Sequence, residues 1–155
     1  MQDDIRTRLK EMGLSLPQPP APAAAYQPWR VHGDWLFVSG QGPLGPQGLT
    51  AIGQVGKEVS LDEARAAAQL AALNVLAHAL AAADAKERRL AACLRLAGFV
   101  QCGADFGDHP KVIDGASDLI NRAMGEAGQH ARIALGAPSL PFNMAVEVEA
   151  LFALA

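Results

Sequence analysis

Apolar residues near the start of the chain recur at helical spacing. Ile5, Leu9 and Met12 lie between N-terminal acids and Gly13, which predicts a short amphipathic helix over residues 3–13. Residues 16–25 are rich in proline and alanine and indicate a stiff, extended connector of polyproline type. We therefore expect residues 1–25 to be an N-terminal helix and Pro-rich connector, laid on a main domain formed by residues 26–155.

From residue 26 onward the pattern becomes that of strands. Residues 29–32, the turn-like Gly33-Asp34 and residues 35–40 predict a β-hairpin. Residues 40–48 are dense in glycine and proline and indicate a loop, and a weaker strand is expected near residues 49–53. The loop lacks the lysine and the following helix of a phosphate-binding loop, so we do not assign it that role.

Two longer helices are predicted in the main domain. Ser60 and Glu63 have the spacing of a capping box, and the Ala- and Leu-rich helix that follows should reach about residue 83. Apolar residues at helical spacing predict a second helix over residues 112–127, which Gly128 ends. Small side chains along the first helix favour close packing on a sheet.

Three further strands complete the pattern. Residues 90–102 are apolar without clear alternation, as expected of a strand that is buried on both faces. The last strands are expected at residues 131–136 and 145–153. This order predicts an α+β fold in which two helices pack on one face of a mixed β-sheet, with an added N-terminal helix.

Composition bounds the class of protein. With 155 residues, 50% of them hydrophobic and 19% charged, the chain is expected to form one globular domain. A net charge of -3 with scattered basic residues gives no electrostatic footprint for nucleic acid. Cys93 and Cys102 match no zinc motif, and the first residues do not resemble a secretory signal. We therefore expect a cytoplasmic protein with two buried, reduced thiols. The polar residues Gln69, Asn74 and His78 argue against a membrane span in the long apolar helix.

Candidate chemistry is concentrated in the last two strands. Arg132 and Glu147 are fifteen residues apart, and a Pro-bearing loop between their strands can return Glu147 to the neighbourhood of Arg132. Arginine grips a planar carboxylate through two parallel hydrogen bonds, and a nearby glutamate handles water or protons. The residues alone favour a structural ion pair across neighbouring strands. Glu149 is the rival acid on the same face. His130 is either a second proton carrier beside Arg132 or a surface residue.

Three segments resemble the RidA/YjgF family, whose members are also called perchloric-acid-soluble or "endoribonuclease L-PSP" proteins. The segments are Tyr26, the strand end Phe37-Val38-Ser39-Gly40-Gln41 and residues 132–149, and Tyr26 precedes Ser39 by thirteen residues as in the family. The resemblance implies a chorismate-mutase-like fold and a homotrimer with three clefts between subunits. In the active branch of the family, each cleft hydrolyses enamine/imine intermediates to a 2-keto acid and ammonia.

The resemblance also implies roles for single residues. Arg132 matches the arginine that binds the substrate carboxylate, and Glu147 matches the acid that positions or activates water. Ser39 and Gly40 match the loop that contacts the ligand, and Tyr26 matches a tyrosine of the cleft, although it is equally typical of a plug at the subunit seam. No metal or organic cofactor is implied.

Some positions depart from the family. Ala134 stands where many members have a cysteine, so thiol chemistry is excluded there, while its backbone remains a candidate ligand contact. Asp114 and Gly115 occupy the region of a helix asparagine seen in several members, and the helix of residues 3–13 and the loop of residues 103–110 are additions. These departures suggest a side branch of the family.

Three functions follow from these patterns. The first is an imine/enamine deaminase that acts on amino-acid-derived intermediates. The second is a trimer that binds small carboxylates or keto acids as a sensor, without turnover. The third is a ribonuclease, which ranks last because basic residues are not clustered and the chain has only eight aromatic residues.

Overall fold

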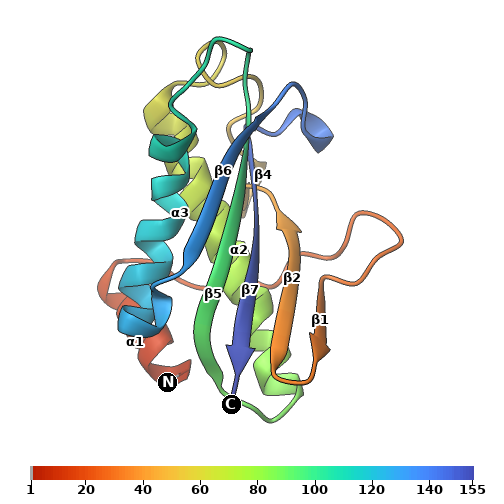
Figure 1. Ribbon diagram of the computed structural model, residues 1–155, viewed down its shortest axis with the longest axis vertical. Helices are drawn as coiled ribbons and strands as arrows, with labels where there is room; N and C mark the ends of the chain where they lie inside the picture. Colours follow the sequence, from red (N-terminus) through yellow and green to blue (C-terminus); the bar gives the residue numbers. More distant parts are fainter. Residues whose placement is uncertain (1) are drawn as a thin grey trace.

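The centre of the fold is a five-stranded mixed sheet in the order β1-β2-β7-β5-β6 (Figure 1). A computed structural model describes residues 2–155. The strands are β1 (Trp29–His32), β2 (Trp35–Gln41), β5 (Leu90–Gln101), β6 (Ala131–Ala137) and β7 (Val146–Leu154). Strand β6 runs parallel to β5, and the other neighbours are antiparallel. The predicted hairpin and the three late strands are therefore confirmed, with ends that differ by one residue.

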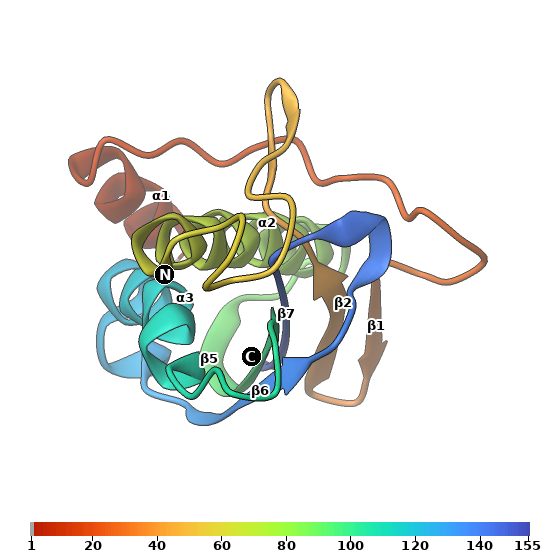
Figure 2. The same ribbon diagram turned by 90° about the horizontal axis from the view of Figure 1, so that it is seen from above.

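Two helices, α2 (Leu61–Ala85) and α3 (His109–Met124), cover one face of this sheet (Figure 2). The capping box at Ser60 and Glu63 begins α2 as predicted. The helices approach closely at Gly115, where any side chain would collide with the backbone carbonyl of Arg65. The predicted α+β architecture, with both helices on one face, is confirmed.

Helix α2 is the core helix of the fold. Within residues 2–155 it is the one helix that is long and apolar enough to cross a bilayer. However, 78% of its most apolar 18-residue stretch is buried inside the protein. Its alanines pack against the sheet and α3, which is the behaviour expected of a helix that is apolar all round in a globular protein. The structure therefore gives the helix a packing role.

The first helix, α1 (Gln2–Glu11), packs on α3 and contributes to the same core, since Ile5 and Leu9 are fully buried there. The connector that follows runs over α2 on the side away from the sheet before the chain enters β1 (Figure 2). The N-terminal segment thus forms a third layer over the helices.

Two boundaries differ from the prediction. Helix α3 begins at His109, within the predicted loop of residues 103–110, because Pro110 occupies the first turn, where its missing N–H costs nothing. The helix ends at Met124 and a 3-10 turn, η1 (Gly125–Gly128), follows. The predicted loop after β2 contains a small hairpin of β3 (Leu44–Gly45) and β4 (Gly48–Leu49), which is paired over too few residues to show as alternation.

The face of the sheet away from the helices is open in the single chain. Strand β5 was predicted to be buried on both faces, and this is wrong for one chain because Leu94 and Arg95 are exposed. Large apolar side chains are also exposed on this face or at its edges; they are Trp35, Phe37, Ile133 and Leu135. An apolar face of this kind marks an interaction surface.

Candidate functional site

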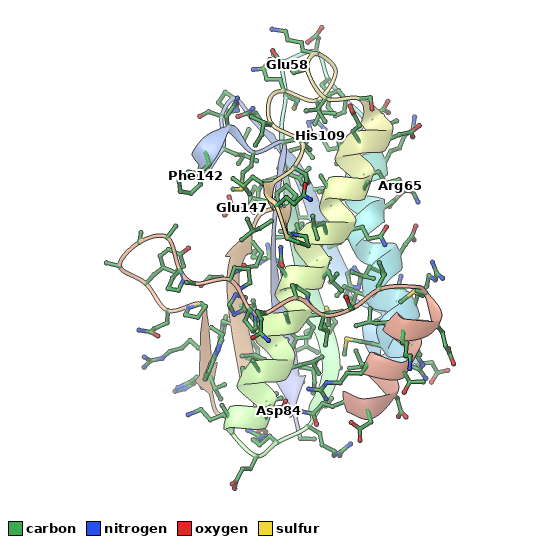
Figure 3. All side chains as sticks on the ribbon, turned by 180° about the vertical axis from the view of Figure 1, so that it is seen from behind. Glu58, Arg65, Asp84, His109, Phe142 and Glu147 are labelled. Atoms are coloured by element: carbon green, nitrogen blue, oxygen red, sulfur yellow. The ribbon has the colours of Figure 1, made fainter. Side chains whose placement is uncertain are left out.

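Three of the predicted site residues, Tyr26, Gly40 and Glu147, meet in one groove of about 510 Å³. The connector contributes Pro20, Ala21, Ala23 and Ala24 to its wall, next to the β3–β4 hairpin. The 3-10 turn η2 (Pro141–Asn143) adds Phe142. Figure 3 shows Phe142 and Glu147 on the same side of α2. The volume lies within the range of about 300–1,000 Å³ that is typical of small-molecule sites.

The Glu147 side chain rests on Gly40. The register between β2 and β7 shifts between Val38 and Gln41, and this bulge brings the backbone of Gly40 against the Glu147 carboxylate. A β-carbon at position 40 would overlap an oxygen of that carboxylate. Glycine is therefore required at this position if Glu147 is to keep its place in the groove.

The electrostatics of Glu147 favour proton exchange. Burial raises the pKa of the Glu147 carboxyl above its ordinary value, and the negative charge of Glu149 raises this pKa further. Both residues lie on the same face of β7, as strand alternation predicted. A carboxyl with a raised pKa takes up and releases protons closer to neutral pH, which suits a general acid or base.

Ser39 lies beside the groove and holds the backbone that leads away from Tyr26. Its hydroxyl donates to the backbone carbonyl of Gln27 at 2.7 Å, and its backbone N–H donates to Pro28 at 3.0 Å. The side chain faces a second hollow of about 240 Å³ on the open sheet face, with Arg95 and Glu149. Ser39 therefore fixes the chain next to Tyr26, and the structure does not place it in the groove with Glu147.

Arg132 occupies a different part of the molecule, on the edge strand β6 facing α3. Its Nη1 atom donates to Asp114 Oδ1 at 2.8 Å and to Ser117 Oγ at 3.2 Å. These two bonds use both hydrogens of Nη1. Within residues 2–155, Nε and Nη2 donate no hydrogen bond to the protein, and the side chain is 24% exposed. The guanidinium thus keeps one edge with two parallel donors, which is the geometry that holds a carboxylate.

His130 helps to position Arg132 through the hydroxyl group of Ser117. Its Nδ1 donates to the Gly128 carbonyl at 2.6 Å, so in the neutral imidazole Nε2 accepts from the Ser117 hydroxyl at 2.9 Å. Ser117 Oγ in turn accepts from Arg132. The prediction that His130 lies on the same side as Arg132 is confirmed, and its contacts are those of a positioning residue. Ala134 also lies on this side of β6, half-buried against the core.

The structure does not bring Arg132 and Glu147 together within one chain, and the expectation that the loop returns one to the other is wrong at this level. Strand β5 lies between β6 and β7, so the two strands are not neighbours. Arg132 pairs with Leu96 on the helix side, whereas Glu147 pairs with Phe99, an odd number of residues further along β5. The two side chains therefore point to opposite faces. The intrachain ion pair between them is equally wrong, since Arg132 pairs with Asp114.

Sequence reasoning missed the partners of Arg132 and the walls of the groove. Asp114 and Ser117 are three residues apart on α3 and so share a helix face, a signal that was present in the sequence. Phe142 and Asn143 adopt left-handed backbone angles, with φ of 56° and 57°. Asparagine tolerates that conformation better than most residues, whereas phenylalanine rarely adopts it, so the residue type of Phe142 gives no signal for the turn.

The cysteines lie outside the groove. Burial raises the pKa of the Cys93 thiol to about 12, and it raises the pKa of Cys102 as well, so both are poor sources of thiolate. The Cys102 sulfur lies 3.3 Å from His109 Nε2. Residues 2–155 contain no cluster of three or more His, Cys, Asp or Glu side chains that would hold a metal ion.

Comparison with known proteins gives the same fold and a family. The chain is 38% identical to Protein TCP17 of Trypanosoma cruzi, over 97% of this chain and 94% of that protein. It resembles the crystal structure of Atu1372, a protein of unknown function from Agrobacterium tumefaciens, with 40% identity and a TM-score of 0.90, over 99% of this chain and 94% of the other. A "putative endoribonuclease" from Shewanella oneidensis has 34% identity and a TM-score of 0.91, over 96% and 98% of the two chains.

A family model described as "YjgF/chorismate_mutase-like, putative endoribonuclease" matches residues 6–154, which confirms the resemblance read from Tyr26, the end of β2 and the last two strands. The match begins at residue 6, within α1, so the second half of the helix that was treated as an addition lies inside the matched region. The chain belongs to the YjgF/chorismate mutase-like family.

Proposed function

We propose that this protein is an imine/enamine deaminase, which hydrolyses reactive intermediates derived from amino acids to 2-keto acids and ammonia. The observation that carries the proposal is the state of Glu147, a half-buried carboxyl with a raised pKa, set on Gly40 inside a groove of ligand size. Arg132, with one free guanidinium edge, supplies the complementary carboxylate clamp.

A homotrimer would unite the two halves of this site. Arg132 lies on edge strand β6, whereas the groove lies beside β2 and the connector, toward the other edge of the sheet. A head-to-tail arrangement that closes into a ring places the β6 edge of one subunit against the groove of the next. The open apolar sheet face, with Trp35, Phe37 and Leu135, supplies a surface for such an association. The proposed cleft is therefore formed by two subunits.

The chemistry asks little of the protein because an imine carbon is already electrophilic. Arg132 holds the substrate carboxylate through Nε and Nη2, and the Glu147 carboxylate takes a proton from a water molecule as its oxygen adds to the C=N carbon. Protonated Glu147 then returns the proton to nitrogen, which gives a carbinolamine. Glu147 next passes the carbinolamine hydroxyl proton to nitrogen as the C–N bond breaks, so that ammonia leaves and the carbonyl forms. An enamine first takes a proton on carbon and loses one from nitrogen, and so becomes the imine. Orientation and proton transfer are the two sources of acceleration.

The test is an assay in which an amino-acid oxidase generates the imine in situ and loss of the imine is followed. Wild type should accelerate hydrolysis. Glu147→Gln should lower turnover by roughly 10²- to 10⁴-fold, the range for removal of a general acid-base group. It should still bind a 2-keto acid, whereas Arg132→Ala should not. Glu149→Gln is the matched control on the same strand face and should retain most of the activity.

A second outcome of this assay leads to the alternative function. If several amino-acid precursors show no acceleration while a 2-keto acid binds in an Arg132-dependent way, the protein is a carboxylate-binding sensor. RNA cleavage ranks behind both, because the residues that line the groove include a carboxylate and no Lys or Arg. A steep loss of RNA affinity with rising salt would favour it.

A further inference from the structure

The groove that holds Glu147 is polar at one place and apolar over most of its wall. Glu147 and Gln41 contribute carboxylate and amide groups, whereas the connector contributes Ala21, Ala23 and Ala24. Leucine, methionine and phenylalanine side chains from the β3–β4 hairpin and the segment before β7 complete the lining. A ligand whose reacting end meets Glu147 would therefore place the rest of its structure against apolar groups.

The connector is held in position by a buried histidine of α2. His78 is 2% exposed and hydrogen bonds to the backbone of Pro20, whose carbonyl must accept because proline has no N–H. At the other end, the Ser39 hydroxyl holds the Gln27 carbonyl. The segment between these two anchors, residues 21–26, includes the apolar wall and Tyr26. The wall is thus fixed to the core at both ends.

The same face of α2 also fixes the hairpin side of the groove. Asn74 lies one turn before His78, is 1% exposed, and donates from Nδ2 to the carbonyls of Gly42 and Leu44 at 3.0 Å each. Buried polar side chains are costly unless they are hydrogen-bonded. Asn74 and His78 lie four residues apart in a helix of alanine and leucine, and each uses one polar atom to hold one side of the groove. Their other polar atoms, Asn74 Oδ1 and His78 Nε2, have no hydrogen-bond partner within residues 2–155.

Phe142, the aromatic residue on the rim of the groove, lies in a strained backbone turn. Phe142 is 68% exposed and has a left-handed φ of 56°. The buried side chain of Gln101 holds this turn, since its Nε2 donates to Asn143 Oδ1 at 2.7 Å and its Oε1 accepts from the Leu140 N–H at 2.9 Å. Left-handed angles at non-glycine residues are strained and persist where the surroundings enforce them. Here they place an aromatic ring on the rim of the groove.

We propose that connector residues 20–24 and Phe142 form a side-chain subsite, which makes the site select 2-imino acids with large apolar side chains, branched aliphatic or aromatic, over small or charged ones. The proposal rests on the proposed function in that Glu147 is the acid of the same groove. Each buried methylene is worth about fourfold in affinity, so the leucine-derived imine should be preferred over the alanine-derived imine by roughly 50-fold.

The experiment compares kcat/KM for imines generated from alanine, leucine, phenylalanine and glutamate. Wild type should prefer the leucine and phenylalanine derivatives by roughly 10- to 100-fold. Ala24→Asp places a charge in the wall and should reduce this ratio at least tenfold, and Phe142→Ala should reduce it as well. Ala25→Asp is the matched control: Ala25 is the next residue, also exposed, and does not line the groove. It should leave the ratio unchanged.

A binding measurement separates this inference from the proposed function. Calorimetry with the 2-keto acids of alanine and leucine reports the subsite without any turnover. If no imine is hydrolysed but the leucine-derived keto acid binds more tightly and Ala24→Asp removes that difference, the deaminase proposal fails and the subsite stands. Equal affinity for both keto acids, or a preference that survives Ala24→Asp, would overturn the subsite.

Discussion

Asp114→Asn should strengthen the binding of anionic ligands at Arg132. The Asp114 carboxylate lies 2.8 Å from Nη1, on one side of the guanidinium, and the free Nε/Nη2 edge lies on the other. A ligand carboxylate on that edge would be on the order of 6 Å from Asp114, where two unit charges repel by about 0.7 kcal/mol in water and about 3 kcal/mol at an effective dielectric constant of 20. Both side chains are partly exposed, so we expect the lower part of this range, roughly a three- to tenfold gain in affinity.

The assay is calorimetric titration with the 2-keto acid derived from leucine, at low and at physiological salt. The gain should shrink as salt rises, since the screening length falls from about 30 Å at 0.01 M to about 8 Å at 0.15 M. The uncharged methyl ester should show no gain. Asp118→Asn is the matched control, because Asp118 lies on the same helix and pairs with Arg65. Weaker binding by Asp114→Asn, independent of salt, would refute this reasoning and show that the charge of Asp114 serves to orient Arg132.

Three further predictions concern stability and are measured by urea unfolding. The raised pKa of Glu147 means that the folded state binds its proton more tightly than the unfolded chain, so stability falls as pH rises through the window between the ordinary and the raised pKa. Glu147→Gln should therefore be more stable than wild type at neutral pH, and a less stable variant would contradict this. Burial lowers the pKa of His78 from its ordinary value of 6.5, so stability should fall as pH drops below that value. His78→Gln should lose this part of the pH dependence, and an unchanged slope would argue against it. Ile5→Ala, at a fully buried position of α1, should cost about 2–4 kcal/mol, whereas a cost below about 0.5 kcal/mol would mean that α1 is dispensable for the core.

The helices and strands could be predicted from the sequence wherever the signal lies within a few neighbouring residues. The capping box at Ser60 and Glu63 set the start of α2, and the turn at Gly33-Asp34 joined β1 to β2, because both depend on residues within a few positions of one another. The predicted start of α3 was wrong although Pro110 is a local signal. Proline occurs both in loops and in the first turn of a helix, and the prediction assigned Pro110 to the loop.

The grouping of the site residues depended on contacts that no local pattern contains. The sequence by itself determined the α+β pattern and the family, since residue type and spacing at Tyr26, the end of β2 and the last strands suffice for both. Only the tertiary structure decided that Glu147 rests on Gly40, that Arg132 pairs with Asp114, and that a connector held by His78 walls the groove. The physical reason is strand order: β5 inserts between β6 and β7, and alternation then sends Arg132 and Glu147 to opposite faces of the sheet.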